Sequence, residues 1–535
     1  MMGMTETASR ATPSTGRAGE RTQEAAGASP ARGEPPDTGR SWVVSLLVLI
    51  VGMFMSVLDV TIVNVAIPAI QDDLGTTTED VLWIATAYTL TLGVVVPLSS
   101  WLGDRFGLSR VYMATLLGFA AGSALCGLAW NLDSLIAFRV VQAVPGGIMP
   151  VVTLTMVYQI VPREKIGIAM GMYGLGIVFA PAVGPVLGGY LVENADWRLI
   201  FFINVPIGIL GLVAAYLLLP DSGRGPRRPF DLLGFLTIGS GLFAILLALH
   251  EGEDWGWTSY PVLMLITFGL LGLALFVLIE LEVAHPLLDV RVFRHWAFTN
   301  SLLLLSILTI GLFSVLFYVP VFLQQGQGLT AFEAGGRILP QALVVAVMMP
   351  LSGRLYDKIG ARPLAITGFA ISAYGTYLLC GINPDMTRGD VVVWTCVRAA
   401  GMGMAMMPVM TAGIASLPKE KVNEGSALNN VTRQVAGAMG LAVLTAMASG
   451  RQAQAMADRA ALLPAATTEL PALGLAGGDV IGMYAFVQRT QLDALASSYS
   501  DVFLVTALVT LLGALLAIPL RAGPANGHAG APPEL

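Results

Sequence analysis

A single carboxylate lies deep inside one of the long apolar stretches of this chain. Asp59 is the only charged residue in residues 42–69. An ionisable group in a nonpolar medium costs free energy and usually marks an ion or proton path. Burial raises the pKa of a carboxyl group and a nearby cation lowers it, so such a group can load and release a proton as its surroundings change. The alternative is a static ion pair or a hydrogen bond to the backbone.

Three arginines, Arg139, Arg398 and Arg433, stand inside other apolar stretches. A buried guanidinium needs a partner or water, because an unpaired buried charge is costly. We expect Arg139 to pair with Asp59, so that a proton reaching the carboxylate would free the arginine. For Arg398 a functional role and a static interhelical bond both stay open, and Arg433 receives no specific role.

The residue clusters that enzymes and metal sites need are missing from the sequence. The cysteines Cys126, Cys380 and Cys396 all fall in apolar runs, and the four histidines have no ligand spacing such as HExxH. No GxxxxGK[ST] loop for nucleotide phosphates occurs either. We therefore predict no catalytic residue, no metal and no cofactor, and a membrane-embedded enzyme is disfavoured.

Composition places these residues in a membrane protein. Of the 535 residues, 55% are hydrophobic and 12% are charged, whereas soluble domains carry about 25% charged residues. The net charge is −6 and no basic face suggests nucleic acid. A spanning helix needs about 20 apolar residues. Fourteen spans are predicted, at 42–69, 82–102, 109–130, 133–161, 166–191, 198–219, 231–250, 260–281, 297–323, 331–353, 362–381, 391–417, 423–448 and 500–520.

Basic residues concentrate on one side of these spans. Loops after even-numbered spans are rich in arginine and lysine, as at Arg224, Arg227 and Arg228, whereas the opposite loops are acidic, as at 251–254. The positive-inside rule then predicts that both termini are cytoplasmic in a multi-pass protein of a bacterial plasma (inner) membrane. Residues 1–41 should form a disordered cytoplasmic tail, and residues 521–535 a second cytoplasmic tail.

An internal repeat divides the chain into two halves. Two loops share the pattern Asp-basic-x-Gly, and Arg139 and Arg398 occupy equivalent places early in the fourth and twelfth spans. The loop residues are Asp104, Arg105, Gly107 and Arg110 after the second span, and Gly353, Asp357, Lys358, Gly360 and Arg362 after the tenth. The predicted units are an N-terminal six-helix bundle at 42–219, a linker with two extra spans at 220–296, and a C-terminal six-helix bundle at 297–520 with an external loop at 449–499.

Each repeated loop has the residue types of a gate at the cytoplasmic face. Asp104 and Asp357 could accept hydrogen bonds from helix N-termini or from arginines of a neighbouring helix. Gly107 and Gly360 would permit a tight turn. Such bonds could lock the outward-open state and break on inward opening. Topology signalling by the basic residues is the alternative, but it needs neither the aspartate nor the glycine.

Small residues recur every four positions in the fifth span. Gly176, Ala180, Gly184 and Gly188 would line one face and allow close helix approach. Two prolines and a last glycine complete the segment: Pro181, Pro185 and Gly189. Proline removes backbone hydrogen bonds and bends a helix. We expect a bent, closely packed helix between the two halves that seals proton leaks, with ordinary small-residue packing as the alternative.

Together these segments resemble the major facilitator superfamily over roughly residues 42–520. The repeated loop is similar to its signature, with Ser100 where glycine is usual and Leu108-Ser109 where a basic residue is common. Four further segments narrow the resemblance to the 14-helix drug:proton antiporter branch. They are Leu58–Pro68, which contains Asp59 and Asn64; Arg139-Val-Val-Gln142-Ala143, with alanine in place of glycine; Gly176–Gly189; and Trp197–Gly208.

The resemblance implies an all-α membrane protein with two six-helix bundles and two extra central helices, 14 in total. It further implies a proton-coupled antiporter that exports hydrophobic or cationic drugs by alternating access and works as a monomer in the lipid bilayer. Asp59 and Arg139 would couple protons, and the cavity or structural polar residues would be Asn64, Gln142, Arg398 and Arg433. A dedicated exporter of one endogenous metabolite or antibiotic is the alternative. Substrate identity, proton stoichiometry and a periplasmic adaptor stay open.

Overall fold

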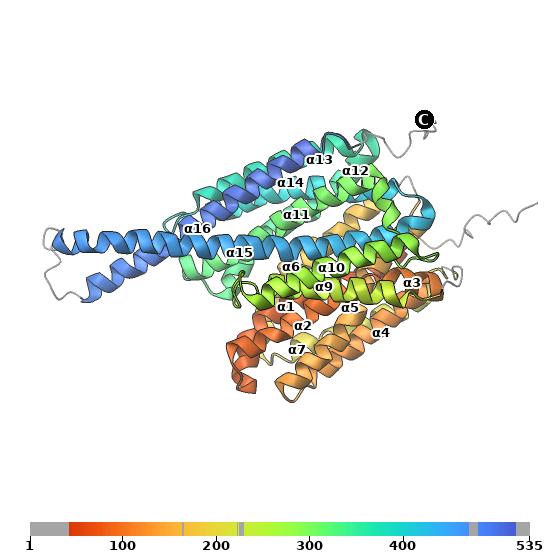
Figure 1. Ribbon diagram of the computed structural model, residues 1–535, viewed down its shortest axis with the longest axis horizontal. Coiled ribbons are helices and arrows are strands. Elements are labelled where there is room, and N and C mark those ends of the chain that lie inside the picture. The colour runs from red at the N-terminus through yellow and green to blue at the C-terminus, as the bar shows by residue number, and fades with distance from the viewer. Residues whose placement is uncertain (1–41, 163–164, 222, 224–228, 470–479, 521–535) are drawn as a thin grey trace, which may run out of the picture. The chain divides into compact units, whose positions relative to one another are not determined.

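The computed structural model describes residues 42–162, 165–221, 223, 229–469 and 480–520 (Figure 1). The two predicted cytoplasmic tails and the arginines at 224–228 lie outside these residues. All regular elements in the described part are helices. The predicted all-α fold is therefore confirmed for this part of the chain.

The helices fall into three groups along the chain. The first group is α1 (Trp42–Leu74), α2 (Thr78–Val95), α3 (Leu98–Phe106), α4 (Leu108–Gly127), α5 (Leu132–Ile160), α6 (Ile166–Asn194), α7 (Leu199–Phe202) and α8 (Asn204–Leu218). The inserted pair is α9 (Leu232–Glu251) and α10 (Tyr260–Glu282), followed by the short turn η2 (Val290–Arg294). The last group is α11 (Trp296–Val321), η3 (Phe322–Gly326), α12 (Ala331–Ile359), α13 (Ala361–Leu378), η4 (Leu379–Gly381), α14 (Arg388–Ala415), η5 (Lys419–Lys421), α15 (Val422–Glu469) and α16 (Val480–Leu516).

The described part contains 13 helices that are long and apolar enough to cross a membrane, and 14 if one bent pair counts as a single span. The upper number agrees with the fourteen predicted spans. The bent pair is Glu79–Val95 with Leu98–Phe106, at an angle of 57°. Pro97 stands at the break, where its missing backbone N–H cannot continue the helical ladder. The predicted span 82–102 is thus two helices.

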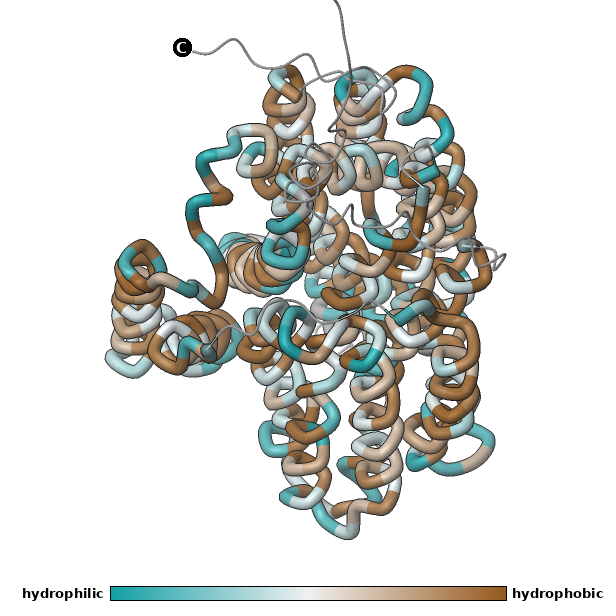
Figure 2. Tube along the Cα trace, turned by 90° about the vertical axis from the view of Figure 1, so that its right-hand side faces the viewer, coloured by the Kyte–Doolittle hydropathy of each residue, from teal (hydrophilic) through white to brown (hydrophobic). Residues whose placement is uncertain are grey.

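The inserted helices lie at the outside of the fold. Helix α9 packs against α2 of the first group and α15 of the last, while α10 packs against α9 and η2. Helix α10 also exposes several large apolar side chains, including Leu270, Leu271 and Leu278. In Figure 2, hydrophobic residues follow the helices and hydrophilic residues gather in the connecting segments. Because lipid tails solvate apolar side chains, an exposed apolar helix of this kind suits a bilayer.

The predicted external loop at 449–499 is largely helical instead. Helix α15 continues to Glu469 and α16 begins at Val480, and both extend beyond the other helices in Figure 1. An ion pair joins the two helices where Arg451 Nε donates to Asp501 at 2.7 Å. The prediction ended the helices where the sequence becomes polar. Helix formation does not require an apolar face in water, and the alanine-rich sequence at 453–463 has high helix propensity.

The direction of the chain in the membrane can be checked with cysteine substitutions at two exposed positions. Asp254 lies beyond the end of α9 and Lys358 near the end of α12. Because the loops that contain them differ in predicted side, a membrane-impermeant thiol reagent added to intact cells should label Asp254→Cys and spare Lys358→Cys. Labelling of both positions, or of Lys358→Cys alone, would contradict the predicted topology.

Candidate functional site

A buried polar network surrounds the carboxylate of Asp59 in α1. Asp59 is fully buried, and three side chains from two other helices donate hydrogen bonds to it. Arg139 of α5 donates from Nη1 to Oδ2. Gln142, one turn later on α5, donates to Oδ1 at 3.0 Å, and Asn204 at the start of α8 donates to the same oxygen at 3.1 Å. Helices α1, α5 and α8 are thereby joined at one carboxylate.

Further contacts fix the orientation of the donors. The guanidinium of Arg139 lies over the ring of Tyr88 in α2, 3.8 Å from its centroid. Nη1 of Arg139 also donates to Gln142 Oε1 at 2.8 Å. Asn204 donates to the hydroxyl of Ser123 at 3.0 Å, and that hydroxyl donates to the carbonyl of Phe201 at 2.8 Å. These contacts hold all three donors toward Asp59.

This arrangement suits an ionised carboxylate. A buried anion is tolerated only when its charge is balanced and its lone pairs accept hydrogen bonds, and here one cation and two amides meet both needs. A protonated Asp59 would itself become a donor on one oxygen. Because the neutral group attracts Arg139 less and its new O–H needs an acceptor, the hydrogen bonds to its present partners would weaken or rearrange. A proton at Asp59 can therefore change the contacts between α1, α5 and α8.

The structure brings Asp59, Arg139 and Gln142 together, and it leaves Asn64 outside. Asn64 follows Asp59 by five positions, which places it on another face of α1, and its side chain is exposed. Sequence reasoning gave no role to Asn204, although this residue stands in the segment Trp197–Gly208. Ser123 and Tyr88 were also missed, because a serine or a tyrosine in an apolar helix gives no signal of its own.

Neither of the other two membrane arginines takes part in this network. Arg398 of α14 is buried and donates from Nη1 to the backbone carbonyl of Gly311 at 3.2 Å. Arg433 of α15 is half-buried, and the group that interacts with it electrostatically is Tyr173 of α6. Within the described residues, no carboxylate lies within 4.0 Å of either guanidinium.

Both repeated loops turn on a glycine that has a positive φ. Gly107 stands between α3 and α4 with φ of 88°, and Gly360 stands between α12 and α13 with φ of 79°. A side chain at either place would be strained, because L-residues rarely adopt this conformation. The glycines thus allow consecutive helices to turn sharply at the predicted cytoplasmic face.

The aspartate of each loop contacts the first turn of a helix from the other half. Asp104 Oδ1 accepts a hydrogen bond of 2.8 Å from the side chain of Asn423, the second residue of α15. Asp357 lies against Gly167, the second residue of α6, where an added Cβ would be 2.7 Å from Oδ1. A carboxylate near a helix N-terminus interacts favourably with the helix dipole. The two halves are therefore in contact through equivalent loops on the predicted cytoplasmic side.

The remaining loop residues have varied surroundings. Arg110 pairs with Asp221 at 3.1 Å, while Lys358 and Arg362 are exposed. Gly353 meets the backbone of α6, since an added Cβ would lie 2.1 Å from the carbonyl oxygen of Gly167. At this position only glycine lets the two backbones approach so closely.

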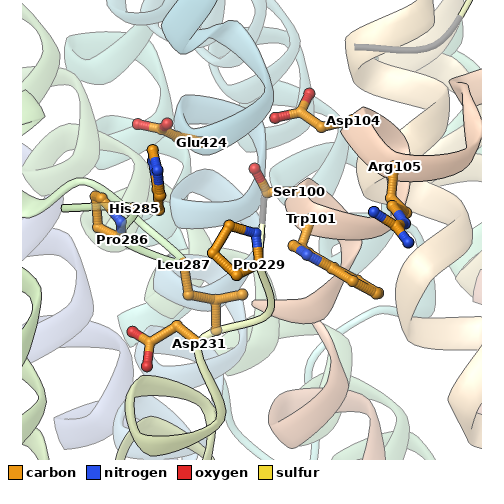
Figure 3. Close-up of a pocket in the computed structure, with 10 residues that line it drawn as sticks. All are labelled: Ser100, Trp101, Asp104, Arg105, Pro229, Asp231, His285, Pro286, Leu287 and Glu424. Atoms are coloured by element: carbon orange, nitrogen blue, oxygen red, sulfur yellow. The ribbon is translucent and has the colours of Figure 1, made fainter. Parts of the chain in front are cut away.

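A small pocket links the first loop to the inserted helices. Figure 3 shows Asp104 and Arg105 on one side of it and Asp231, His285 and Glu424 around the rest. Beside the pocket, Lys421 pairs with Asp289 at 2.6 Å. Burial by itself would raise the pKa of Asp289, but the hydrogen bond from Lys421 holds this pKa below its usual value. The segment after α10 is thus tied to the start of α15.

The small-residue face of α6 packs within its own half. An added Cβ at Gly184 would lie 2.1 Å from Thr61 Oγ1, and one at Gly188 would lie 3.0 Å from the carbonyl oxygen of Ile62. Both partners belong to α1. The expectation that this face meets the other half is therefore wrong. Residues four apart share one face of a helix, but their spacing does not say which neighbour that face meets.

Helix α6 does contact the other half, through a different face. Gly171 and Gly174 pack against Met349 of α12. An added Cβ at Gly171 would lie 2.7 Å from the Met349 carbonyl oxygen, and one at Gly174 would lie 2.5 Å from the Met349 Cε. Pro185 of α6 also lies near Gly335 of α12. Helix α6 thus stands between α1 and α12, with small residues on both sides.

Comparison with known proteins agrees with this architecture. The family model of the Major Facilitator Superfamily matches residues 49–441. The chain belongs to the major facilitator superfamily. It is therefore a transporter and not an enzyme.

Relatives in this superfamily include a multidrug transporter. The chain is 35% identical over 406 residues to the uncharacterised MFS-type transporter YhcA of Bacillus subtilis, covering 76% of each chain. It is 32% identical to the multidrug transporter protein MdtP of the same organism, covering 77% of this chain and 76% of the relative. The solved structure of the proton:xylose symporter XylE has a TM-score of 0.55 at 12% identity, covering 87% of this chain and 94% of the symporter, and shows the shared fold.

Loss of charge in the repeated loops should slow this transporter. Asp104→Asn and Asp357→Asn keep the side-chain size but weaken contacts with α15 and α6. We expect the transport rate of Asp104→Asn to fall about tenfold or more, since a hydrogen bond to a charged group contributes about 1.5–3 kcal/mol. The rate of Asp357→Asn should also fall, because a charge near the first turn of α6 is lost, while substrate affinity stays unchanged in both variants. Initial rates and equilibrium binding of purified protein would measure this.

Asp254→Asn is the control for both loop variants, because it removes an exposed carboxylate beyond the end of α9 and outside both loops. It should leave transport near the wild-type rate. Wild-type rates in both Asp104→Asn and Asp357→Asn would mean that these loops only direct membrane insertion.

Proposed function

We propose that this transporter exports hydrophobic or cationic drugs in exchange for protons by alternating access. The observation that carries the proposal is the fully buried carboxylate of Asp59, held by donors from two other helices. Similarity to a multidrug transporter supports the substrate class. The bacterial plasma membrane, with both termini in the cytoplasm, is the proposed location.

The proton step follows from the hydrogen bonds of Asp59. When a proton binds, the carboxylate loses its charge and most of its attraction for Arg139, and its new O–H needs an acceptor. The freed guanidinium would keep its contact with the ring of Tyr88, 3.8 Å from the centroid in the present state. Since Asp59, Arg139 and Asn204 belong to α1, α5 and α8, this change alters packing inside the first half.

The loop contacts complete the cycle. Contacts of Asp104 with α15 and of Asp357 with α6 would hold the cytoplasmic ends of the halves together in one state. Movement of α6, which lies between α1 and α12, would pass a change near Asp59 to the other half. The sequence has no nucleotide-binding loop, so transport is driven by an ion gradient or by none. We propose the proton gradient, because Asp59 is a buried group that can change its charge.

A substrate screen in proteoliposomes tests the proposal. Purified protein would be reconstituted, a pH gradient imposed, and uptake of a panel of cationic, neutral and anionic compounds measured. We expect several chemically unrelated hydrophobic or cationic drugs to be transported only with the gradient. Transport that ignores the pH gradient would refute proton coupling, and transport of one compound alone would indicate a dedicated exporter.

A further inference from the structure

A small cavity lies where the first half of the chain meets the second. Pro181 and Val178 of α6 line it from the first half, and α11, α12 and α14 line it from the second. Its free volume is about 20 Å³, which is room for one water molecule. The walls are apolar apart from two side chains, Gln341 of α12 and Arg398 of α14. The cavity therefore sits where the two halves separate during alternating access.

Arg398 brings an uncompensated positive charge to this cavity. The residue is 3% exposed, and its Nε has no hydrogen-bond partner. Its one backbone bond goes to the carbonyl of Gly311 at 3.2 Å, and no carboxylate of the described residues lies within 4.0 Å. Arg139, the equivalent residue of the first half, is instead paired with Asp59. A buried cation without an anion is costly, so the cavity favours a negatively charged ligand.

Gln341, the second polar side chain that lines the cavity, also has an atom without a hydrogen-bond partner. Gln341 is 7% exposed, and its Oε1 has no hydrogen-bond partner. An amide in this position can donate or accept, depending on its orientation. It can therefore bind a second oxygen of a ligand that pairs with Arg398.

Close backbone packing holds Arg398 in place. An added Cβ at Gly375 of α13 would lie 2.3 Å from the backbone nitrogen of Arg398. Helices α13 and α14 are thus in direct backbone contact at this residue. The guanidinium is positioned by the packing of its helix and not by a partner acid, which leaves its charge available to a ligand.

We infer that Arg398, with Gln341, binds an anionic oxygen in the cavity between the halves. This inference rests on the proposed function and adds to it that carboxylate-bearing amphipathic drugs are recognised, including those that also carry a cation. The anionic oxygen is that of the substrate's carboxylate, and a small inorganic anion such as chloride in its place is the other occupant that the test distinguishes. To admit a drug the cavity would have to widen, because its present free volume of about 20 Å³ holds one water molecule.

A matched pair of dyes tests this site. Rhodamine B carries a carboxylate, and its ethyl ester has the same cationic ring system without that charge. Their affinities for purified protein would be measured by fluorescence polarisation, which needs no proton gradient. Arg398→Gln should weaken rhodamine B about tenfold or more, the value of a hydrogen bond to a charged group, and should leave the ester unchanged. Arg398→Lys should retain part of the affinity.

Gln341→Glu is a second variant that keeps Arg398 and neutralises its charge. It should weaken rhodamine B and spare the ester, and ester binding at the wild-type affinity shows that each variant is folded. Replacing sodium chloride with sucrose at equal osmolarity distinguishes the two ligands, because sucrose carries no charge. If chloride is the ligand, its removal changes binding of both dyes to the wild type and has no effect on Arg398→Gln.

The inference would be overturned if Arg398→Gln lost the same affinity for both dyes with and without chloride. It would also be overturned if the wild type bound the ester but not rhodamine B. Either result would leave Arg398 with a structural role only. Failure of the proposed function would appear elsewhere, as transport that does not respond to a pH gradient while the dye affinities still differ.

Discussion

Proteoliposomes that contain the Asp59→Asn protein should release no protons when substrate is added and should take up no drug when a pH gradient is imposed. Asparagine has nearly the shape of aspartate but cannot ionise, so it cannot carry a proton through the cycle. Arginine cannot substitute, because its pKa stays above about 12. Proton release and drug uptake would both fall to the level of liposomes without protein.

Two comparisons separate this effect from damage to the fold. Asp72→Asn removes an exposed carboxylate from the same helix, and it should transport at the wild-type rate. Asp59→Glu keeps an ionisable group and should retain part of the activity. Drug binding to Asp59→Asn should persist, because the amide can still accept hydrogen bonds from Gln142 and Asn204. Exchange of drug for protons at the wild-type rate in Asp59→Asn would show that another group carries the proton.

Gly188→Leu should insert in the membrane and fail to transport. An added Cβ would already lie 2.9 Å from Ile62 Cγ1 and 3.0 Å from its carbonyl oxygen, so a leucine must push α6 away from α1. Overpacking of this kind typically costs about 1–3 kcal/mol. Ile62 follows Asp59 by three residues, so the displacement also disturbs the polar network. Drug transport and passive proton leak would be measured in the same proteoliposomes.

The neighbouring residue offers a closely matched control. Gly189 is on the same helix, and an added Cβ there would meet nothing within 4 Å. Gly189→Leu makes the same chemical change at nearly the same depth, and it should retain most of the wild-type transport rate. If Gly188→Leu and Gly189→Leu transport equally well, close packing of α6 on α1 has no part in the mechanism.

The sequence by itself determined that the chain folds into membrane-spanning helices, and it singled out Asp59 and Arg139 as a charged pair inside them. Long apolar runs must be helices in lipid, because every backbone polar group has to be satisfied within the segment. An acid and an arginine in such runs are costly unless they meet, and Asp59 and Arg139 do meet although they are 80 residues apart. The repeated loops were visible because glycine and aspartate at fixed spacing leave a pattern. The helical extensions of α15 and α16 show no long apolar run, because a helix in water needs none.

The tertiary structure alone decided which side chains share a space. Asn64, five positions after Asp59, faces another side of α1 by helical geometry alone. Asn204 instead reaches Asp59 across 145 residues, because the rotation of each helix about its axis is set by its neighbours. The same reason explains why the glycines of α6 at 184 and 188 meet α1 and not the other half. Arg139 and Arg398 occupy equivalent places in the repeat, yet the first has a carboxylate beside it and the second has a cavity. The sequence offers one deep carboxylate and already favours Arg139 as its partner. Only the packing of distant helices decides that Arg398 borders a cavity between the two halves.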